Sequence, residues 1–468
     1  MTPEEFRRHG YALVDWVADY WSTLGDQRVT PDGPPGTTAA ALPAAPPEQG
    51  DGLAGLREDL DRIVVPNLTH WQHPGFFGYF PANTSGPSVL ADLVGAGLGV
   101  QGMLWSTGPA CTELETVVLD WLAQLLDLPD RLRSTGPGGG VIQDSASSAT
   151  LVATLAAVHR ASGGRWRASG VDGRFRVYTS TQGHSSIEKA ARIAGLGDGA
   201  VRLVDVDGSY AMRPDALRAA LAADVAAGAV PAVVVATVGT TSTTAIDPLS
   251  AIGEICREYA VWLHVDAAYA GSAAVCPELR WIHDGLEYAD SYCFDPHKWL
   301  LTGFDCDAFW VADRAGLVEA LTVLPEYLRN AATESGAVID YRDWQVPLGR
   351  RFRALKLWFV LRWYGAEGLR AHIRHGVALA GRFAGWVADD PRFEIVAPHP
   401  LSLVCFRLRG PDGPNEELLR RVNATGAVYL THTKVGGRFV LRLAVGSPHT
   451  GERHVADAWR LIDRYAGS

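Results

Sequence analysis

The sequence predicts an α/β fold in which helices cover both faces of a mainly parallel sheet. Short apolar runs rich in β-branched residues, which are typical of buried strands, alternate with longer segments of helical periodicity. Such alternation specifies crossover connections between parallel strands, with a layer of helices on either side. The runs expected to be strands of this sheet are 175–179, 201–206, 233–241, 261–265 and 291–294.

The size and charge of the chain exclude several classes of protein. A length of 468 residues suggests two or three packed units, and a net charge of −10 provides no basic surface for nucleic acid. No apolar run approaches the roughly 20 residues that span a bilayer, and the first residues lack the pattern of a secretory signal. We therefore expect a cytoplasmic protein without a membrane partner.

The six cysteines are scattered and form no Cys-x-x-Cys pair. Most of them lie in apolar stretches, where free thiols behave as small core residues. Neither a zinc site nor a disulfide framework is expected.

The chain opens with the signals of a helix start at Thr2 to Glu5, namely a hydroxyl cap, a proline and a capping-box glutamate. Large apolar residues then recur at near-helical spacing, too many for a free-standing surface helix. This face packs either within its own chain or on a second subunit. Residues 31–52 are rich in Pro, Ala and Gly without periodicity and are expected to be a connector. The apolar residues in question are Phe6, Leu13, Trp16, Val17, Tyr20 and Trp21.

Residues 73–85 combine dense aromatic residues with two prolines and two glycines, in the order HPGFFGYFPANTS. The pattern favours a rigid aromatic loop, and a core segment is the alternative. A long amphipathic helix is expected over 109–125, after which GGGVIQDSASSAT at 138–150 leads into a helical run. Small hydroxyl residues at a helix start place backbone N–H groups and Ser Oγ atoms around one anion. An ordinary helix cap would carry the same residues.

Asp266 and Lys298 are expected at the same rim of the sheet. Asp266 ends the strand 261–265, and the strand 291–294 leads directly to His297 and Lys298. In an open α/β sheet, ligands bind at the carboxyl ends of the strands.

This rim has three interpretations. Asp266 and Lys298 could form a structural ion pair, or His264, Asp266 and His297 could hold a metal, although no further ligand cluster supports a metal. In the third interpretation the lysine forms a Schiff base with pyridoxal 5'-phosphate (PLP), and the aspartate keeps the ring nitrogen protonated.

Beyond residue 350 the pattern predicts a smaller α+β unit. Helices are expected over 350–364 and 367–388, with a final helix from about 452 to 466. Strands are expected near 403–409 and 438–445.

Two motifs, DAAYAG at 266–271 and PHKWL at 296–300, together resemble the aromatic-L-amino-acid decarboxylases, group II of the PLP-dependent decarboxylases. The resemblance extends from WQHPGFF at 71–77 to FVLRL at 439–443. It implies the PLP-dependent transferase-like fold type I, with an N-terminal helical segment and a C-terminal α+β domain.

The resemblance also implies a homodimer with active sites at the subunit interface. Residues 1–80 would form the helical segment that packs on the partner subunit. Residues 81–345 would form the large PLP-binding domain, and residues 346–468 the small C-terminal domain.

The resemblance assigns roles around the cofactor. Lys298 would carry PLP, Asp266 would pair with its ring nitrogen, and His184 would stack on its ring. One departure concerns position 295, which is usually Asn in the family and is Asp here. A carboxylate near the phosphate is repelled unless it is protonated or turned away. The other expected cofactor contacts are Ser145, Ala146 and Ser147 as the phosphate cradle, together with Thr241, Ala268, Asp295 and His297.

The resemblance likewise implies a pocket for an aromatic substrate. His184 would hydrogen-bond the substrate carboxylate, and Gly349 would leave room for a large ring such as indole. Met103 and Leu104 belong to a segment that would reach across the dimer into the partner's pocket. The residues expected to line the ring are Trp71, Tyr79, Phe80, Pro81 and Ala82.

The composition of 324–336 is that of a mobile loop. The tyrosine at its Pro-x-Tyr-Leu motif, Tyr327, would close over the site and protonate the carbanion carbon. Relatives with Phe at this position tend to be aldehyde synthases, so Tyr327 favours simple decarboxylation.

We therefore expect a carboxy-lyase that converts an aromatic L-amino acid to the arylalkylamine and CO2. Ala82 and Met103 favour Trp or Phe as substrate, with Tyr and DOPA also within range. An aromatic acetaldehyde synthase and a non-catalytic family member are the alternatives. Intact Lys298, Asp266, His184 and Tyr327 argue against the non-catalytic protein.

Overall fold

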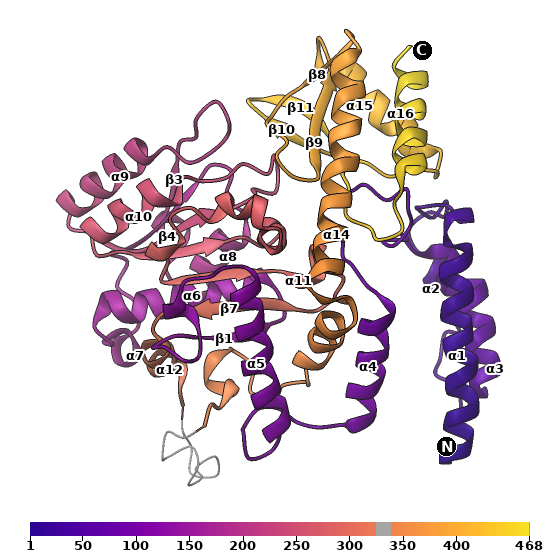
Figure 1. The fold of residues 1–468 in the computed structure, drawn as a ribbon, viewed down its shortest axis with the longest axis horizontal. Helices are drawn as coiled ribbons and strands as arrows, with labels where there is room; N and C mark the ends of the chain where they lie inside the picture. The colour runs from indigo at the N-terminus through magenta and orange to yellow at the C-terminus, as the bar shows by residue number, and fades with distance from the viewer. Residues whose placement is uncertain (324–337, 468) are drawn as a thin grey trace.

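The computed structural model describes residues 1–323 and 338–467, and these build two sheets with their helices. Figure 1 shows the larger sheet with its helices beside a smaller C-terminal unit, and the first three helices standing along one side. Tyr327, the expected proton donor, lies outside the described residues.

The larger sheet has seven strands in the order β1-β7-β6-β5-β4-β2-β3. Neighbours from β6 through β3 pair in parallel, whereas β7 is antiparallel to both β6 and β1, so the expected mainly parallel sheet is confirmed. The strands are β1 Gly139–Gln143, β2 Phe175–Ser180, β3 Val201–Val204, β4 Val230–Thr237, β5 Trp262–Asp266, β6 Ser291–Phe294 and β7 Asp307–Val311.

Each face of this sheet packs on its own set of helices. In β4, Val234 and Ala236 join one apolar cluster while Val233 and Val235 join the other, because successive side chains of a strand point to opposite faces. The first cluster includes α5 Pro109–Leu125, α9 Pro214–Ala226 and α10 Leu249–Glu258. The second includes α6 Ala146–Ser162, α8 Ser186–Ile193 and α12 Arg314–Leu321.

The C-terminal unit contains a four-stranded antiparallel sheet in the order β10-β11-β9-β8. Its strands are β8 Phe393–Ile395, β9 Leu403–Leu408, β10 Thr431–Val435 and β11 Arg438–Ala444. Its helices are α14 Ala354–Asp389, α15 Asp412–Ala424 and α16 Glu452–Ala466. The two helices expected over 350–364 and 367–388 are both present and share the label α14: the first begins at Ala354, and they meet at a kink at Gly365, whose φ of 60° is left-handed. The sequence interpretation missed β8, β10 and α15.

The N-terminal segment comprises α1 Pro3–Thr23, α2 Thr37–Ala41 and α3 Gly52–Asp59. The capping box is confirmed: the Glu5 N–H donates to Thr2 Oγ1 (3.2 Å) and the Thr2 N–H donates to Glu5 Oε2 (2.7 Å). The connector expected over 31–52 contains the short helix α2.

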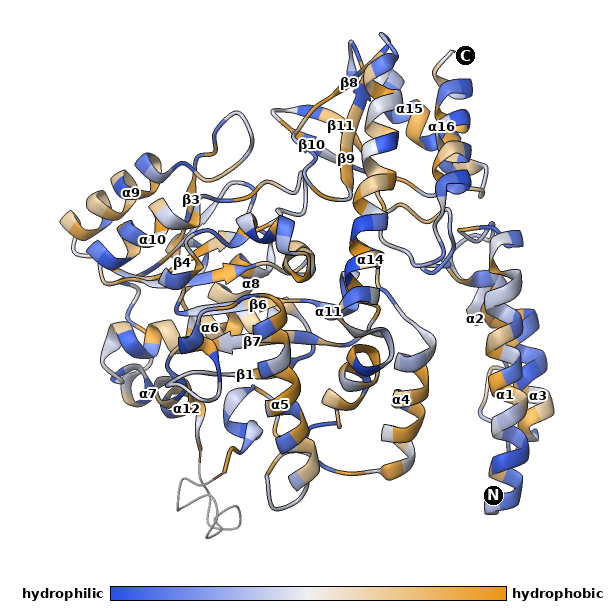
Figure 2. Ribbon diagram, in the orientation of Figure 1, coloured by the Kyte–Doolittle hydropathy of each residue, from blue (hydrophilic) through white to orange (hydrophobic). Residues whose placement is uncertain are grey.

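Two helices present apolar side chains to solvent. None of the residues of α1 is buried, and Phe6, Tyr11 and Val14 are among its exposed ones. Helix α4, Gly86–Leu98, is apolar along much of its length, as Figure 2 shows. In this chain both helices lack a covering layer over these side chains. The exposed apolar residues of α4 are Leu90, Leu93, Val94 and Leu98.

Over the described ranges, no helix is both long enough and apolar enough to cross a membrane.

Candidate active site

The predicted site residues gather at the carboxyl edge of the parallel strands, where ligands of such sheets bind. Strand β5 ends at Asp266, and β6 runs into the short helix α11, Pro296–Trp299, which carries His297 and Lys298. Strand β4 is followed by the turn that contains Thr241, and β2 is followed by His184. The local strand pattern therefore positions side chains that are far apart in the sequence.

The amine of Lys298 is paired with Asp295. Its Nζ lies 2.7 Å from Asp295 Oδ2, and 28% of the lysine side chain remains exposed, so a ligand can reach this side chain. Burial alone lowers the pKa of Lys298, but the carboxylates of Asp295 and Asp266 outweigh burial and raise it. In the structural interpretation Lys298 would pair with Asp266, but its ion-pair partner in the structure is Asp295.

Asp266 is buried at the end of β5, where its Oδ1 accepts a hydrogen bond from the Ala268 N–H (3.0 Å). Burial raises the pKa of this carboxyl, and the charges of Lys298 and His184 oppose the rise. A carboxylate that is poorly solvated gains most from a cationic partner. Asp266 is therefore suited to hold a protonated nitrogen beside it.

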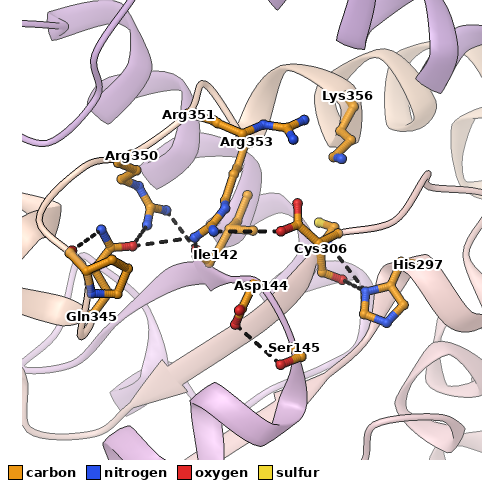
Figure 3. Close-up of polar contacts among 12 residues, drawn as sticks. Ile142, Asp144, Ser145, His297, Cys306, Gln345, Arg350, Arg351, Arg353 and Lys356 are labelled. Carbon is orange, nitrogen blue, oxygen red and sulfur yellow. Dashed lines mark hydrogen bonds and ion pairs between the residues drawn. The ribbon is translucent and has the colours of Figure 1, made fainter. Parts of the chain in front are cut away.

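The predicted anion cradle lies at the N-terminus of α6. Its first turn leaves backbone N–H groups without partners in the helix, and the Ala146 N–H donates to Asp295 Oδ1 (3.1 Å). Ser145 Oγ donates to Asp144 Oδ1 (3.3 Å), as Figure 3 shows, and Ser147 is exposed. A carboxylate from α11's N-terminal flank thus uses a donor of this cradle.

His184 and His297 are both held through Nδ1. His184 Nδ1 accepts a hydrogen bond from the Ser186 N–H (3.2 Å), and the histidine charge reaches Asp266. His297 Nδ1 lies 2.8 Å from the Cys306 carbonyl oxygen, and its Nε2 lies 3.8 Å from Asp295 Oδ2. These contacts fix the planes of two imidazoles at the rim.

The aromatic segment around residue 80 reaches the same rim. Phe80 stacks on Tyr269 with 3.7 Å between ring centroids, and Tyr269 stacks on Trp299 (4.8 Å), the residue after Lys298. The Asn83 N–H also donates to the His297 carbonyl oxygen (2.6 Å). The Phe80 ring and the Asn83 N–H therefore hold this segment beside α11, with the buried Pro81 and the half-buried Ala82 between them.

Tyr79 belongs to a separate, more exposed group of rings. It stacks on Trp71 with 5.6 Å between centroids, and it lies 6.3 Å from the ring of Tyr429. Its φ of 52° is left-handed, which is uncommon for a residue other than glycine.

Met103, Leu104 and Gly349 form a third group. The Arg342 N–H donates to the Met103 carbonyl oxygen (3.1 Å), and the Arg350 N–H donates to Gln101 Oε1 (2.6 Å). Within the described ranges, hydrogen bonds join these two segments to each other and not to Lys298. The structure does not bring this group onto the lysine in a single chain.

One buried arginine was not identified from the sequence. Arg442 of β11 donates to the carbonyl oxygens of Thr241 (2.8 Å) and Tyr79 (3.4 Å), and its guanidinium lies 5.4 Å from the ring centre of Phe80. Burial lowers the pKa of Arg442. A charged residue between two leucines of an apolar strand was the available signal, because such a residue must find partners when buried.

A second missed group fixes the strand that leads into the cradle. Arg350 donates to the Ile142 carbonyl oxygen at the end of β1 (2.9 Å) and forms a buried ion pair with Glu115. Arg353 also donates to Ile142 (3.3 Å), and Figure 3 shows both arginines converging beside Asp144 and Ser145. This network holds β1 where α6 must begin.

Over the described ranges, no group of three or more His, Cys, Asp or Glu residues is arranged to hold a metal ion. The metal interpretation of His264, Asp266 and His297 has no geometric support, since His264 Nδ1 lies 2.9 Å from Ser291 Oγ in the core.

Comparison with known proteins gives a consistent result. The pyridoxal-dependent decarboxylase conserved domain matches residues 35–409. Phenylacetaldehyde synthase of Arabidopsis thaliana is 46% identical over 100% of this chain and 96% of its own length. Aromatic-L-amino-acid decarboxylase of Sus scrofa is 46% identical over 99% of this chain and 96% of its own.

Solved structures agree across the whole fold. The structure of Oryza sativa TDC with PLP and tryptamine has a TM-score of 0.96 at 42% identity, covering 100% of this chain and 98% of its own. Tryptophan decarboxylase of Catharanthus roseus in complex with L-tryptophan has a TM-score of 0.94 at 42% identity, covering 100% and 99%.

Proposed function

Because the chain belongs to the pyridoxal-dependent decarboxylase family, we propose that it catalyses the α-decarboxylation of an aromatic L-amino acid, releasing the arylalkylamine and CO2. The expected fold type I, the PLP cofactor and the carboxy-lyase class are confirmed by this membership. The observation that carries the proposal is the accessible Lys298 side chain at a rim that also holds Asp266 and the α6 N-terminus.

The residues at this rim suit PLP by their chemistry. Lys298 offers an amine to an aldehyde, Asp266 offers a carboxylate to a ring nitrogen, and the first turn of α6 offers N–H donors to a phosphate. When bound, PLP supplies an electron sink for the electron pair left as CO2 departs. The proposed remaining contacts are His184, Ser145, Ser147, Thr241, Ala268, Asp295 and His297.

The side chains at the rim stabilise charge, orient the cofactor and the substrate, and transfer protons. Asp266 keeps its partner nitrogen cationic, because a buried carboxylate is a preorganised charge, and such charges are usually the largest catalytic term. His184, held through Ser186, presents a flat face to the cofactor and an imidazole to the substrate carboxylate. Lys298, with its raised pKa, takes a proton whenever its amine is released. Tyr327, assigned from the sequence alone, would give the proton to Cα.

The aromatic side would select the substrate. Phe80, seated on Tyr269, provides an apolar wall, and Trp71 and Tyr79 provide a second. Ala82, Met103 and Gly349 are small or apolar and leave room for an indole or phenyl ring. We therefore propose Trp or Phe as preferred substrates, with Tyr and DOPA accepted less well.

We propose a cytoplasmic homodimer with active sites at its interface. The exposed apolar faces of α1 and α4 support this assembly, since such contiguous surfaces mark interfaces. Residues 1–80 would pack on the partner, and Met103 and Leu104 would enter the partner's pocket. We also propose that residues 81–345 form the large PLP-binding domain and residues 346–468 the small C-terminal domain.

An acetaldehyde synthase is the second candidate. Two such proteins resemble the chain throughout, the Arabidopsis thaliana protein and Rhodiola rosea 4-hydroxyphenylacetaldehyde synthase, the latter with a TM-score of 0.93 at 39% identity. That reaction consumes O2 and yields the aldehyde, CO2, ammonia and peroxide.

Product identification separates these functions. The PLP-loaded protein is incubated with L-Trp, L-Phe, L-Tyr or L-DOPA, and products are identified by mass spectrometry with a peroxide assay. We expect tryptamine from L-Trp without peroxide, and kcat/KM highest for Trp or Phe. Indole-3-acetaldehyde with peroxide would establish the synthase, and a clear preference for DOPA would overturn the proposed substrate choice. An absence of turnover with any of the four, despite a normal cofactor band, would favour the non-catalytic protein.

A further inference from the structure

Asp295 makes two contacts that PLP would also make. Its Oδ1 accepts the hydrogen bond from the Ala146 N–H at the start of α6, and its Oδ2 lies 2.7 Å from Lys298 Nζ. A phosphate at the α6 N-terminus needs the first of these donors, and an aldehyde needs the lysine amine. The buried Asp295 carboxylate therefore contacts both groups that would hold the cofactor, the Ala146 N–H for its phosphate and the Lys298 amine for its aldehyde.

The position of Asp295 leaves little freedom to avoid this conflict. It follows β6 directly, and its N–H donates to the Ala268 carbonyl oxygen (2.9 Å). The pairing of Phe294 with Ala308 places Asp295 next to Asp307 of β7, where a second carboxyl is fully buried. With its backbone held in this way, Asp295 can release the Ala146 N–H and the Lys298 amine only by rotation of its side chain.

Lys298 and His297 favour the ionised form of Asp295. Burial raises the pKa of this carboxyl, but Lys298 and His297 outweigh burial and lower it. Burial, followed by the charge of Asp295, raises the pKa of Asp307 well above its ordinary value, which favours the protonated form of Asp307. The titratable groups that act on or respond to Asp295 are His297 and Lys298 of α11, Asp307 of β7, Asp266 of β5 and Cys293 of β6.

We propose that Asp295 is the resident anion of the phosphate subsite. When PLP binds, the Asp295 side chain leaves this subsite and takes up a proton, which neutralises its charge. The inference rests on the proposed function in one respect, that the phosphate lies at the α6 N-terminus. The bound phosphate brings a second negative charge beside the carboxylate, and the lysine gives up its ammonium. Both changes favour the protonated form of Asp295.

Two measurable consequences follow for cofactor affinity. Affinity falls as pH rises through neutrality, because proton uptake becomes harder, and each unit by which binding raises the pKa of Asp295 is a factor of ten in affinity. Replacing the carboxyl by an amide removes both the competition and the proton. Asp295→Asn is therefore expected to bind the phosphate-bearing cofactor at least about tenfold more tightly at pH 7.5.

The test uses pyridoxine 5'-phosphate, which lacks the aldehyde and so reports the phosphate subsite without bond formation to Lys298. Calorimetry at pH 7.5 in two buffers of different ionisation enthalpy yields both Kd and the protons taken up. We expect uptake close to one proton for the unaltered protein, and none for Asp295→Asn together with the lower Kd. Asp307→Asn is the matched control, and its Kd should change less than threefold because Asp307 already favours its neutral form.

Several results would overturn the inference. These are no proton uptake by the unaltered protein, equal or weaker binding by Asp295→Asn, or equal tightening in Asp295→Asn and Asp307→Asn. Circular dichroism verifies folding, and Asp295→Ser replaces Asp295→Asn if the amide variant does not fold. PLP binding by the unaltered protein, read from its visible absorption band, is a separate test: its absence would count against the proposed function itself.

Discussion

Two parts of the site differ in how complete they are within one chain. They are the lysine side, which contains Asp266, Asp295 and Lys298, and the aromatic side, which contains Trp71, Tyr79 and Phe80. Asp266 and Asp295 are buried, and each has hydrogen-bond partners inside the chain. On the aromatic side, half of the Tyr79 surface is exposed, and the apolar residues of α4 face solvent. We therefore propose that a single chain supplies the cofactor half and that the dimer completes the substrate half.

Because of this difference, the lysine side should respond to pH and the aromatic side to protein concentration. Ion pairs and buried carboxyls make the lysine side sensitive to pH. Uncovered apolar surface makes the aromatic side sensitive to protein concentration, because association depends on mass action. Variants in each half should separate these dependences.

The largest effect is expected for Lys298→Ala, which removes the lysine side's only proposed covalent anchor for PLP. Decarboxylation should fall at least about a thousandfold, and the visible absorption band of the lysine-bound cofactor should disappear. The exposed Lys189→Ala is the matched control and should retain both. Substantial activity in Lys298→Ala would mean that another amine holds the cofactor.

A smaller effect is expected when α4 is made polar by Leu93→Asp with Leu98→Asp. Two charges on the uncovered face should dissociate the dimer, and decarboxylation should fall about a hundredfold as the substrate half is lost. Cofactor affinity should change much less, because the lysine side is internal. Sedimentation velocity and PLP titration provide the two readouts.

The control for this pair is Leu203→Asp, an equally exposed leucine on the edge strand β3. It should leave assembly and activity intact. A dimer that survives the α4 substitutions would show that the subunits meet elsewhere.

The smallest effect is expected for stability between pH 4 and 6. Burial lowers the pKa of His264 to about 3 and the pKa values of His73, His283 and His372 to about 4, so near pH 5 the unfolded state binds about four more protons at these groups than the native state. Asp247, whose pKa burial raises to about 6, and Asp307, whose pKa burial raises well above its ordinary value, oppose them with one proton each. Stability should therefore rise with pH over this range, because the histidine protons outnumber those of the two carboxyls.

Urea unfolding at fixed protein concentration measures this slope. His283→Gln should make it shallower by about 1.4 kcal/mol per pH unit, since one histidine proton is then lost. The exposed Arg409→Gln is the control and should leave the slope unchanged. A slope that falls with pH would mean that buried carboxyls, and not histidines, dominate.

Local patterns predicted much of the fold. The capping box at Thr2, helix α9 and strand β6 follow from signals within a few residues of each other. Strand β10 was missed because its sequence THTKV is polar and only its ends are buried. Short, mostly exposed strands form because a neighbour pairs with them, and that neighbour is not visible in local sequence.

The sequence predicted which motifs form the site, but not which side chains pair with each other within it. The sequence placed Asp266 and Lys298 at one rim, but the partner of the lysine proved to be Asp295. Arg442 was missed because its role depends on the carbonyl oxygens of Tyr79 and Thr241, which only the tertiary fold brings together. A sequence does not show which backbone carbonyl oxygens will accept a hydrogen bond from a given side chain.

The aromatic segment is bonded to the end of the chain, and this constrains when each half forms during synthesis. The Phe77 N–H donates to the Tyr429 carbonyl oxygen, and the Ala444 N–H donates to the Phe77 carbonyl oxygen. All seven strands around Lys298 are translated by residue 311, whereas β11 emerges from the ribosome more than a hundred residues later. A nascent chain can therefore assemble its cofactor half while its substrate half still awaits a strand, which leaves the apolar rings of residues 71–80 exposed to chaperones and to other chains.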